Sequence, residues 1–207
     1  MKDLLVFTAD ADALAFLRAL LTRHKALGVR KLDFDVERHP LRDSGMVQSG
    51  AELLRMRKGG YHKAALVFDH HGCGREHKLA PQQLEADLQR KLDSFSWSGN
   101  STVTVLAPEL ERWLWFCEPA IARHFGINVG DLKEWVNERA GLLKKDADAL
   151  RLQQPKELFE HIVRERCRTT ISPRDFAEIG SFASVSSLKR CPTFSALLST
   201  FRQWFPT

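Results

Sequence analysis

Apolar and polar residues follow one another along the first half of the chain in blocks that predict strands and helices in turn. Short apolar blocks predict strands at residues 3–8, 29–37, 64–68 and 102–106. Apolar residues at three- and four-residue spacing predict helices between them, as in residues 81–95. This order predicts an α/β, Rossmann-like fold with a mostly parallel four-stranded sheet, flanked by helices and joined by right-handed crossovers.

The apolar blocks also predict where each strand lies in the sheet. The strands at 3–8 and 64–68 are continuously apolar, which is typical of strands buried on both faces. The strand at 29–37 instead alternates apolar with acidic residues. One wet face of this kind predicts an edge strand.

Several local signals predict where the elements begin and end. Asp12 is expected to cap the first helix, and Gly28 to close it. Residues 40–50 have the composition of a loop, and 51–57 that of a short basic helix. After the fourth strand, Pro108 predicts that a helix opens at once.

The last third of the chain has a different pattern, because it contains no strand signal. Helices are predicted at residues 129–139, 155–166, 173–179 and 194–204. No flexible linker precedes this basic region. We therefore divide the chain into an α/β domain at 1–126 and a helical C-terminal extension at 127–207 that packs on it.

Composition narrows the class of protein. With 207 residues, 43% of them hydrophobic and 28% charged, the chain can form a substantial core. A formal charge of +5 permits a polyanionic partner without requiring one. Four separated cysteines without a C-x-x-C pair fit a reducing compartment, and no apolar stretch approaches the ~20 residues that span a bilayer. We expect a cytoplasmic protein with no membrane association and no signal peptide.

Acidic residues follow three of the four predicted strands. Asp10 and Asp12 follow the first, Asp69 the third, and Glu109 and Glu111 the fourth. The carboxyl ends of parallel strands meet at one edge, where α/β folds bind ligands. Carboxylates gathered there repel one another unless a cation lies between them, and hard oxygen ligands suit Mg²⁺ or Mn²⁺. The sequence therefore predicts a divalent-metal site, with helix capping as the competing role for Asp12 and a helix-dipole contact as that for Glu109.

Zinc is an alternative metal. Five potential nitrogen and sulfur ligands lie close together in sequence, at His62, His70, His71, Cys73 and His77. Their spacing matches no standard zinc motif, and adjacent residues of a continuing strand point to opposite faces.

The order of an acid after the first strand, FDHHG after the third and PELERWLW after the fourth resembles the Toprim-like fold of OLD-family nucleases. Together with QQPKELFEHIV and SLKRCPTFSALLSTFRQWFP, these blocks are similar to the small Toprim-related proteins of methylation-associated bacterial anti-phage defence systems. In such nucleases, acids from the strand ends gather divalent metal for phosphodiester chemistry.

The resemblance implies roles for particular residues. Asp10, Asp69, His71 and Glu111 would hold the metal and catalyse attack of a metal-bound water on phosphorus. Lys156 would contact the phosphate of a nucleic acid, and other defence proteins would be partners. The chain departs from the pattern at His71, which stands in place of an acid, and at Asp10, where glutamate is usual. Histidine suits Mn²⁺, Zn²⁺ or Fe²⁺ better than Mg²⁺.

Two other functions stay open. A catalytically degenerate module would bind nucleic acid or a partner defence protein without cleaving, consistent with the departure at His71. Alternatively, the D-A-D-A sequence that begins at Asp10 and the D-H-H triplet that begins at Asp69 resemble DHH-family phosphoesterases, which hold two Mn²⁺ ions. Against the latter, no intermediate aspartate is evident between residues 40 and 68, and the chain lacks room for a second domain.

Overall fold

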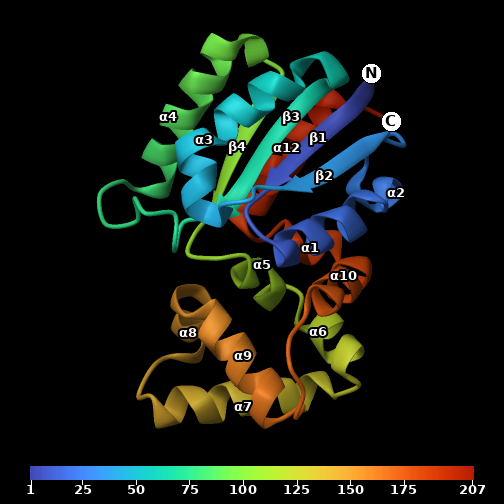
Figure 1. Cartoon of the computed structure of the whole chain (residues 1–207). Coiled ribbons are helices and arrows are strands. Elements are labelled where there is room, and N and C mark those ends of the chain that lie inside the picture. Colours follow the sequence, from blue (N-terminus) through green and yellow to red (C-terminus); the bar gives the residue numbers. More distant parts are fainter.

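The computed structural model describes residues 1–207 and contains a four-stranded sheet in which all strands are parallel (Figure 1). The strands are β1 (Lys2–Thr8), β2 (Phe34–Arg38), β3 (Tyr61–Asp69) and β4 (Ser101–Leu106), in the spatial order β2-β1-β3-β4. This arrangement confirms the predicted α/β fold. It also confirms that the acidic second strand lies at an edge.

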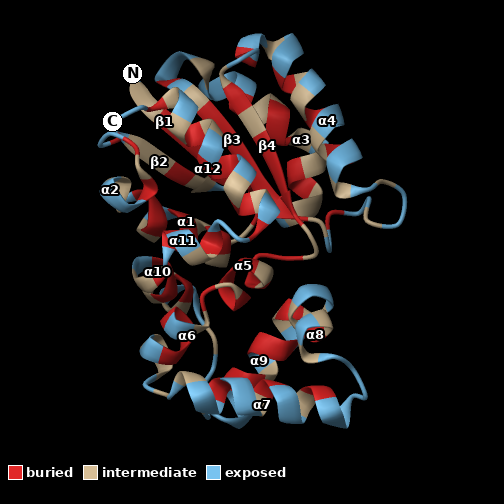
Figure 2. Cartoon of the chain, turned by 180° about the vertical axis from the view of Figure 1, so that it is seen from behind, coloured by how far each residue is buried: buried red, intermediate tan, exposed pale blue.

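Alternate residues of the central strands point into two helical layers. Leu4 and Val6 of β1 face α1 (Ala11–Leu21) and α12 (Pro192–Trp204). Leu5 and Phe7 face α3 (Arg42–Arg57) and α4 (Pro81–Leu92) on the other side. The buried residues of Figure 2 accordingly lie on both faces of the sheet. This two-sided burial is why β1 and β3 read as uninterrupted apolar runs.

The chain leaves β4 for a helical region beyond the carboxyl edge of the sheet (Figure 1). It contains α5 (Glu111–Trp115), α6 (Glu118–Phe125), α7 (Val129–Leu142), α8 (Ala147–Gln153) and α9 (Pro155–Glu165). Then α10 (Pro173–Phe182) and α11 (Val185–Leu188) lead back to the sheet. No helix in the chain has the length and apolar character that crossing a bilayer requires.

The helices after residue 126 fall into two groups. Helices α7 to α9 lie beyond the sheet edge, whereas α10 packs along α1 and α12 packs against β4. Buried residues of both groups belong to one apolar core of 41 residues, which also includes Leu4 and Val6 of the sheet. The C-terminal segment is therefore built into the main core.

Two predicted helix ends were wrong. The N-cap of α1 is Asp10 rather than Asp12, because the Asp10 Oδ1 atom accepts a hydrogen bond of 2.7 Å from the backbone N–H of Ala13. Helix α1 ends at Leu21. Gly28 instead ends the short helix α2 (His24–Leu27), in a left-handed conformation with φ of 69°.

The loop predicted at 40–50 was also wrong, since α3 already begins at Arg42. Its glycines mark close packing rather than a turn. A Cβ atom on Gly45 would lie 2.2 Å from the imidazole of His39, and that imidazole accepts the backbone N–H of Leu41 at the start of the helix.

Other boundaries differ from their predictions. β2 begins only at Phe34, and the helix after β4 begins at Glu111 instead of at residue 107. Pro108 lies before that helix, and its carbonyl accepts the backbone N–H of His71. The short helices α6, α8 and α11 were not predicted, because each is too short to show an apolar period.

Close approach of α10 to α1 makes a prediction about stability. A Cβ atom on Gly180 would lie 2.8 Å from the backbone oxygen of Phe16, so we expect Gly180→Ala to lower the free energy of unfolding by about 1–3 kcal/mol. Gly141 of α7 has no atom within 4 Å of such a Cβ, so Gly141→Ala is the matched control and leaves stability unchanged or raises it. Urea unfolding measures both, and equal effects would contradict the packing argument.

Candidate functional site

Asp69, the last residue of β3, lies at the centre of the carboxyl edge. Its side chain is only 7% exposed, and the Oδ1 atom accepts a hydrogen bond of 3.0 Å from the backbone N–H of Leu110. The backbone N–H of Asp69 donates to the Oδ1 atom of Asp43 at 3.0 Å. The apolar run of β3 thus ends in a carboxylate inside the protein, between α3 and the segment before α5.

Glu111, the first residue of α5, is the most isolated of the acidic residues. It is 5% exposed, accepts no hydrogen bond from another residue and forms no ion pair. Glu109 is equally buried, but its Oε1 atom lies 3.2 Å from the Nδ1 atom of His71. The carboxylate of Glu111 is stabilised only by its own backbone N–H and, through space, by the charge of Lys156, so it keeps capacity to bind a cation or a further proton donor.

The carboxylates of this region raise one another's pKa values. Burial raises the pKa of Asp69 well above its usual value, and the negative charges of Glu111, Asp43 and Asp10 raise it further. Burial likewise raises the pKa of Glu111 to about 8 and that of Asp43 to about 6. We call Asp10, Asp43, Asp69 and Glu111 the carboxylate cluster.

The acids after β1 join this region through the start of α1. Asp10 caps the helix and adds repulsion to Asp43, Asp69 and Glu111. Asp12 lies in the first turn, where burial and then the charge of Asp10 raise its pKa to about 6. The structure therefore brings the predicted residues Asp10, Asp69 and Glu111 to one edge, as the strand order requires.

Lys156 supplies positive charge to the carboxylate cluster. It is the second residue of α9, whose start is fixed because the indole N–H of Trp115 donates to the carbonyl of Pro155 at 2.9 Å. Burial lowers the pKa of Lys156, but Glu111, Glu109 and Asp69 outweigh it and raise the pKa overall. Lys156 forms no direct ion pair, so it acts on the cluster through space.

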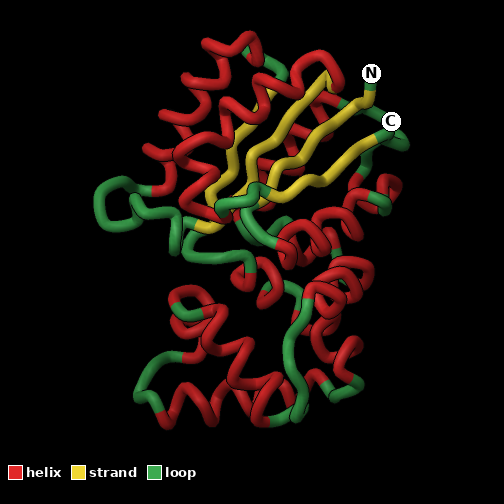
Figure 3. The backbone as a smooth tube through the Cα atoms, viewed as in Figure 1, coloured by secondary structure: helices red, strands yellow, loops and turns green.

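The histidines lie at the rim. Figure 3 shows the long loop that follows β3, and its first residues are His70 and His71. The side chain of His71 is 61% exposed and contacts Glu109, whereas the Nε2 atom of His70 lies 2.9 Å from the carbonyl of Leu79. Gly72 and Gly74 turn the loop with φ values of 82° and 76°. His71 thus reaches the cluster through Glu109.

Asp43 was not predicted as a site residue. It lies in the first turn of α3, whereas the predicted site residues were acids that directly follow strands. A signal was present in the comparison with DHH-family phosphoesterases. The interpretation that no intermediate aspartate is evident between residues 40 and 68 was wrong, because Asp43 lies in that interval.

The donor atoms of the carboxylate cluster suit a hard cation, since they are carboxylate oxygens and Glu111 has no partner. As placed, however, no three His, Cys, Asp or Glu side chains form a ligand set for one ion, and this includes the histidines and cysteine considered for zinc. Binding a cation would require carboxylate side chains to rotate toward it.

Comparison with protein-family models, with curated proteins and with solved structures found no match.

The raised pKa of Glu111 predicts a pH dependence of stability. Glu111 binds its proton more tightly in the folded state, so its contribution is favourable at pH 4 and is lost as pH rises from about 4.5 to about 8. We expect Glu111→Gln, which cannot ionise, to be more stable than the wild type at pH 8.5 by on the order of 1–4 kcal/mol.

Thermal and urea unfolding at pH 4 and pH 8.5 in EDTA measure this difference. Glu134→Gln, at an exposed position on α7, is the control and leaves the pH profile unchanged. Identical profiles for Glu111→Gln and the wild type would contradict the assignment.

Proposed function

We propose that the carboxylate cluster binds a divalent cation, and that the protein is a metal-dependent phosphodiesterase that acts on nucleic acid. The observation that carries the proposal is Glu111, a buried carboxylate with no donor from another residue, beside the buried Asp69. Their repulsion is relieved by protons or by a cation, and at neutral pH a cation relieves it without loss of charge.

When bound, a divalent cation would lower the pKa of a water molecule that it holds and would stabilise negative charge on the phosphate. Asp69 and Glu111 would hold the cation, with Asp10 and Asp43 next to them. Lys156 would attract a phosphate oxygen from the side of α9. This division of roles agrees with the raised pKa of Lys156, which keeps the ammonium charged.

His71 is placed to handle protons at the rim. An ionised Glu109 accepts a hydrogen bond from the Nδ1–H group of His71, which leaves the Nε2 atom of that neutral imidazole as a hydrogen-bond acceptor. A rim histidine of this kind would take a proton from water or give one to a leaving oxygen. We therefore assign His71 a proton-transfer role rather than a place in the innermost ligand set.

Nucleic acid as the substrate is supported by the net charge of +5 and by basic residues of the C-terminal third. Membership of a bacterial anti-phage defence system, with other defence proteins as partners, is proposed on the sequence resemblance alone. The presence of Asp43 in the carboxylate cluster also supports the DHH-type alternative, because that resemblance implies an intermediate aspartate between residues 40 and 68. Both alternatives share divalent-metal phosphoester chemistry.

A non-cleaving module is the second candidate, and Lys156 favours it. The ammonium group already compensates part of the negative charge of the carboxylate cluster. A protein with an internal counter-ion of this kind can keep the edge folded without metal and bind nucleic acid through its basic surface.

A cleavage assay tests the proposal. Purified protein is incubated with supercoiled and linear DNA and with RNA, in Mg²⁺, Mn²⁺, Zn²⁺ or EDTA. We expect cleavage with at least one of these ions and none in EDTA. Asp69→Asn and Glu111→Gln are expected to lower the rate at least about 100-fold, because each removes a charge that holds the cation.

Asp131→Asn, an exposed acid at the start of α7, is the matched control and retains the wild-type rate. Absence of cleavage by the wild type under every metal would refute the phosphodiesterase proposal. Salt-sensitive DNA binding without cleavage would instead support the non-cleaving module.

A further inference from the structure

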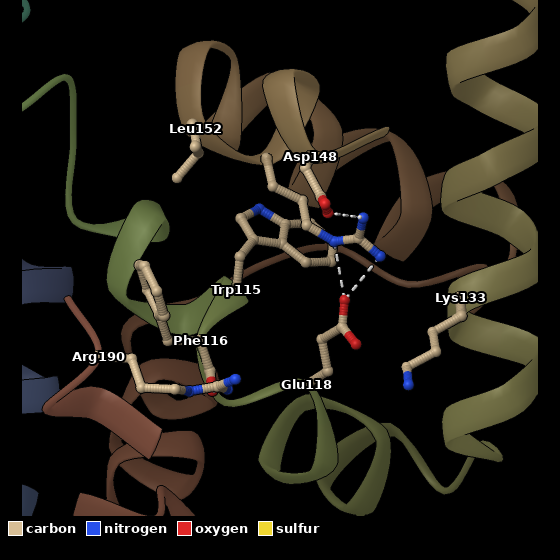
Figure 4. A pocket seen from close by; sticks show the side chains of 8 residues that line it. Trp115, Phe116, Glu118, Lys133, Asp148, Leu152 and Arg190 are labelled. Carbon is tan, nitrogen blue, oxygen red and sulfur yellow. Dashed lines mark hydrogen bonds and ion pairs between the residues drawn. The ribbon is translucent and has the colours of Figure 1, made fainter. Parts of the chain in front are cut away.

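A cavity of about 440 Å³ lies in the helical region, apart from the carboxylate cluster (Figure 4). It is open to solvent on one side and is lined by residues of α5, α6, α7, α8 and the turns after α5 and α11. Its lining residues are Trp115, Phe116, Glu118, Lys133, Asp148, Arg151, Leu152 and Arg190. The volume falls within the range of small-molecule pockets, and no residue is shared with the carboxylate cluster.

One wall of the pocket is a fixed network of charges. The guanidinium of Arg151 contacts the Oε1 atom of Glu118 through Nε and Nη2, both at 2.8 Å, and the Oδ1 atom of Asp148 through Nη1 at 3.0 Å. The side chains of Arg151 and Glu118 are only 14% and 13% exposed. Arg151 is therefore paired with two carboxylates, so the network keeps one negative charge, and the Oε2 atom of Glu118 accepts no hydrogen bond (Figure 4).

Two other cations of the lining have no carboxylate partner. Arg190 donates to the carbonyls of Phe116 and Ser187, at 3.1 and 3.4 Å, and lies 5.9 Å from the Phe116 ring. Lys133 makes no hydrogen bond or ion pair. The three cations and two carboxylates of the lining leave a net charge of +1. Lys133 and Arg190 are its two cations without a carboxylate partner, and the backbone already orients the guanidinium of Arg190.

The rest of the lining is apolar. Phe116 is partly exposed, Leu152 is 38% exposed, and the more deeply buried Trp115 lies behind them. A flat apolar group would cover Leu152 and contact the aromatic side chains. An anion alone would leave this surface in water.

We propose that this pocket binds a mononucleotide. Its phosphate would lie between Lys133 and Arg190, its base would contact Phe116 and Leu152, and the Oε2 atom of Glu118 would accept an N–H or O–H group. A phosphate group has three terminal oxygens and can accept hydrogen bonds from Lys133 and Arg190 together, which favours a nucleotide over an aromatic amino acid. The assignment is independent of the proposed function, because the pocket needs no metal.

Calorimetric titration of the full chain in EDTA tests the proposal. The probes are adenosine and uridine 5′-monophosphates, adenosine, inorganic phosphate and tryptophan. We expect a nucleotide to bind at least tenfold more tightly than adenosine, phosphate or tryptophan. Lys133→Ala, Arg190→Gln and Leu152→Glu are each expected to weaken its binding about tenfold or more. The first two remove a positive charge at the phosphate, and the third puts a negative charge in place of the apolar surface that contacts the base.

Lys189→Ala, the neighbour of Arg190 outside the pocket, and Asp69→Asn in the carboxylate cluster are expected to leave nucleotide binding unchanged. Leu152 is a surface position, so Leu152→Glu tests the pocket with a folded protein even where another variant unfolds. No nucleotide binding, tighter binding of tryptophan, or binding lost in Asp69→Asn would overturn the proposal. Nucleic-acid cleavage in metal is measured separately, so failure of either proposal is recognised on its own.

Discussion

Burial of the Asp69 carboxylate at the end of β3 is the constraint on which this edge of the molecule depends. A carboxylate that is 7% exposed has few ways to be stabilised, and this one uses the backbone N–H of Leu110. That bond ties the start of α5 to the sheet and places Glu111 nearby. The N–H of Asp69 ties down Asp43 in the same way. Two backbone hydrogen bonds therefore assemble acids from three elements.

Helix α5 joins this edge to the helical region. It begins at Glu111 beside Asp69 and ends four residues later at Trp115, which forms part of the pocket wall and holds Pro155 at the start of α9. Lys156 follows directly and adds its charge to the carboxylate cluster. One short helix thus fixes the relative position of the acids, the lysine and the pocket.

The parallel sheet and the meeting of Asp10, Asp69 and Glu111 were predictable, because uninterrupted apolar runs indicate buried parallel strands and their ends must share an edge. The place of Asp43 at this edge was not predictable, because the glycines of α3 have the composition of a loop. In the structure Gly45 instead permits close packing against His39. His71 was expected among the metal ligands, but its contact with Glu109 depends on how the loop after β3 turns. The pocket also was not predicted, because all of its lining residues except Lys133 come from short helices without an apolar period or from the turns that follow them.

The most direct test of the carboxylate cluster as a metal site is an anomalous-scattering map from crystals grown with Mn²⁺. We expect a peak within about 2.6 Å of carboxylate oxygens of both Asp69 and Glu111, which those side chains would reach by rotation. Crystals of Asp69→Asn should lose the peak. Well-ordered wild-type crystals with no peak at this edge, or with manganese bound only elsewhere, would contradict this expectation.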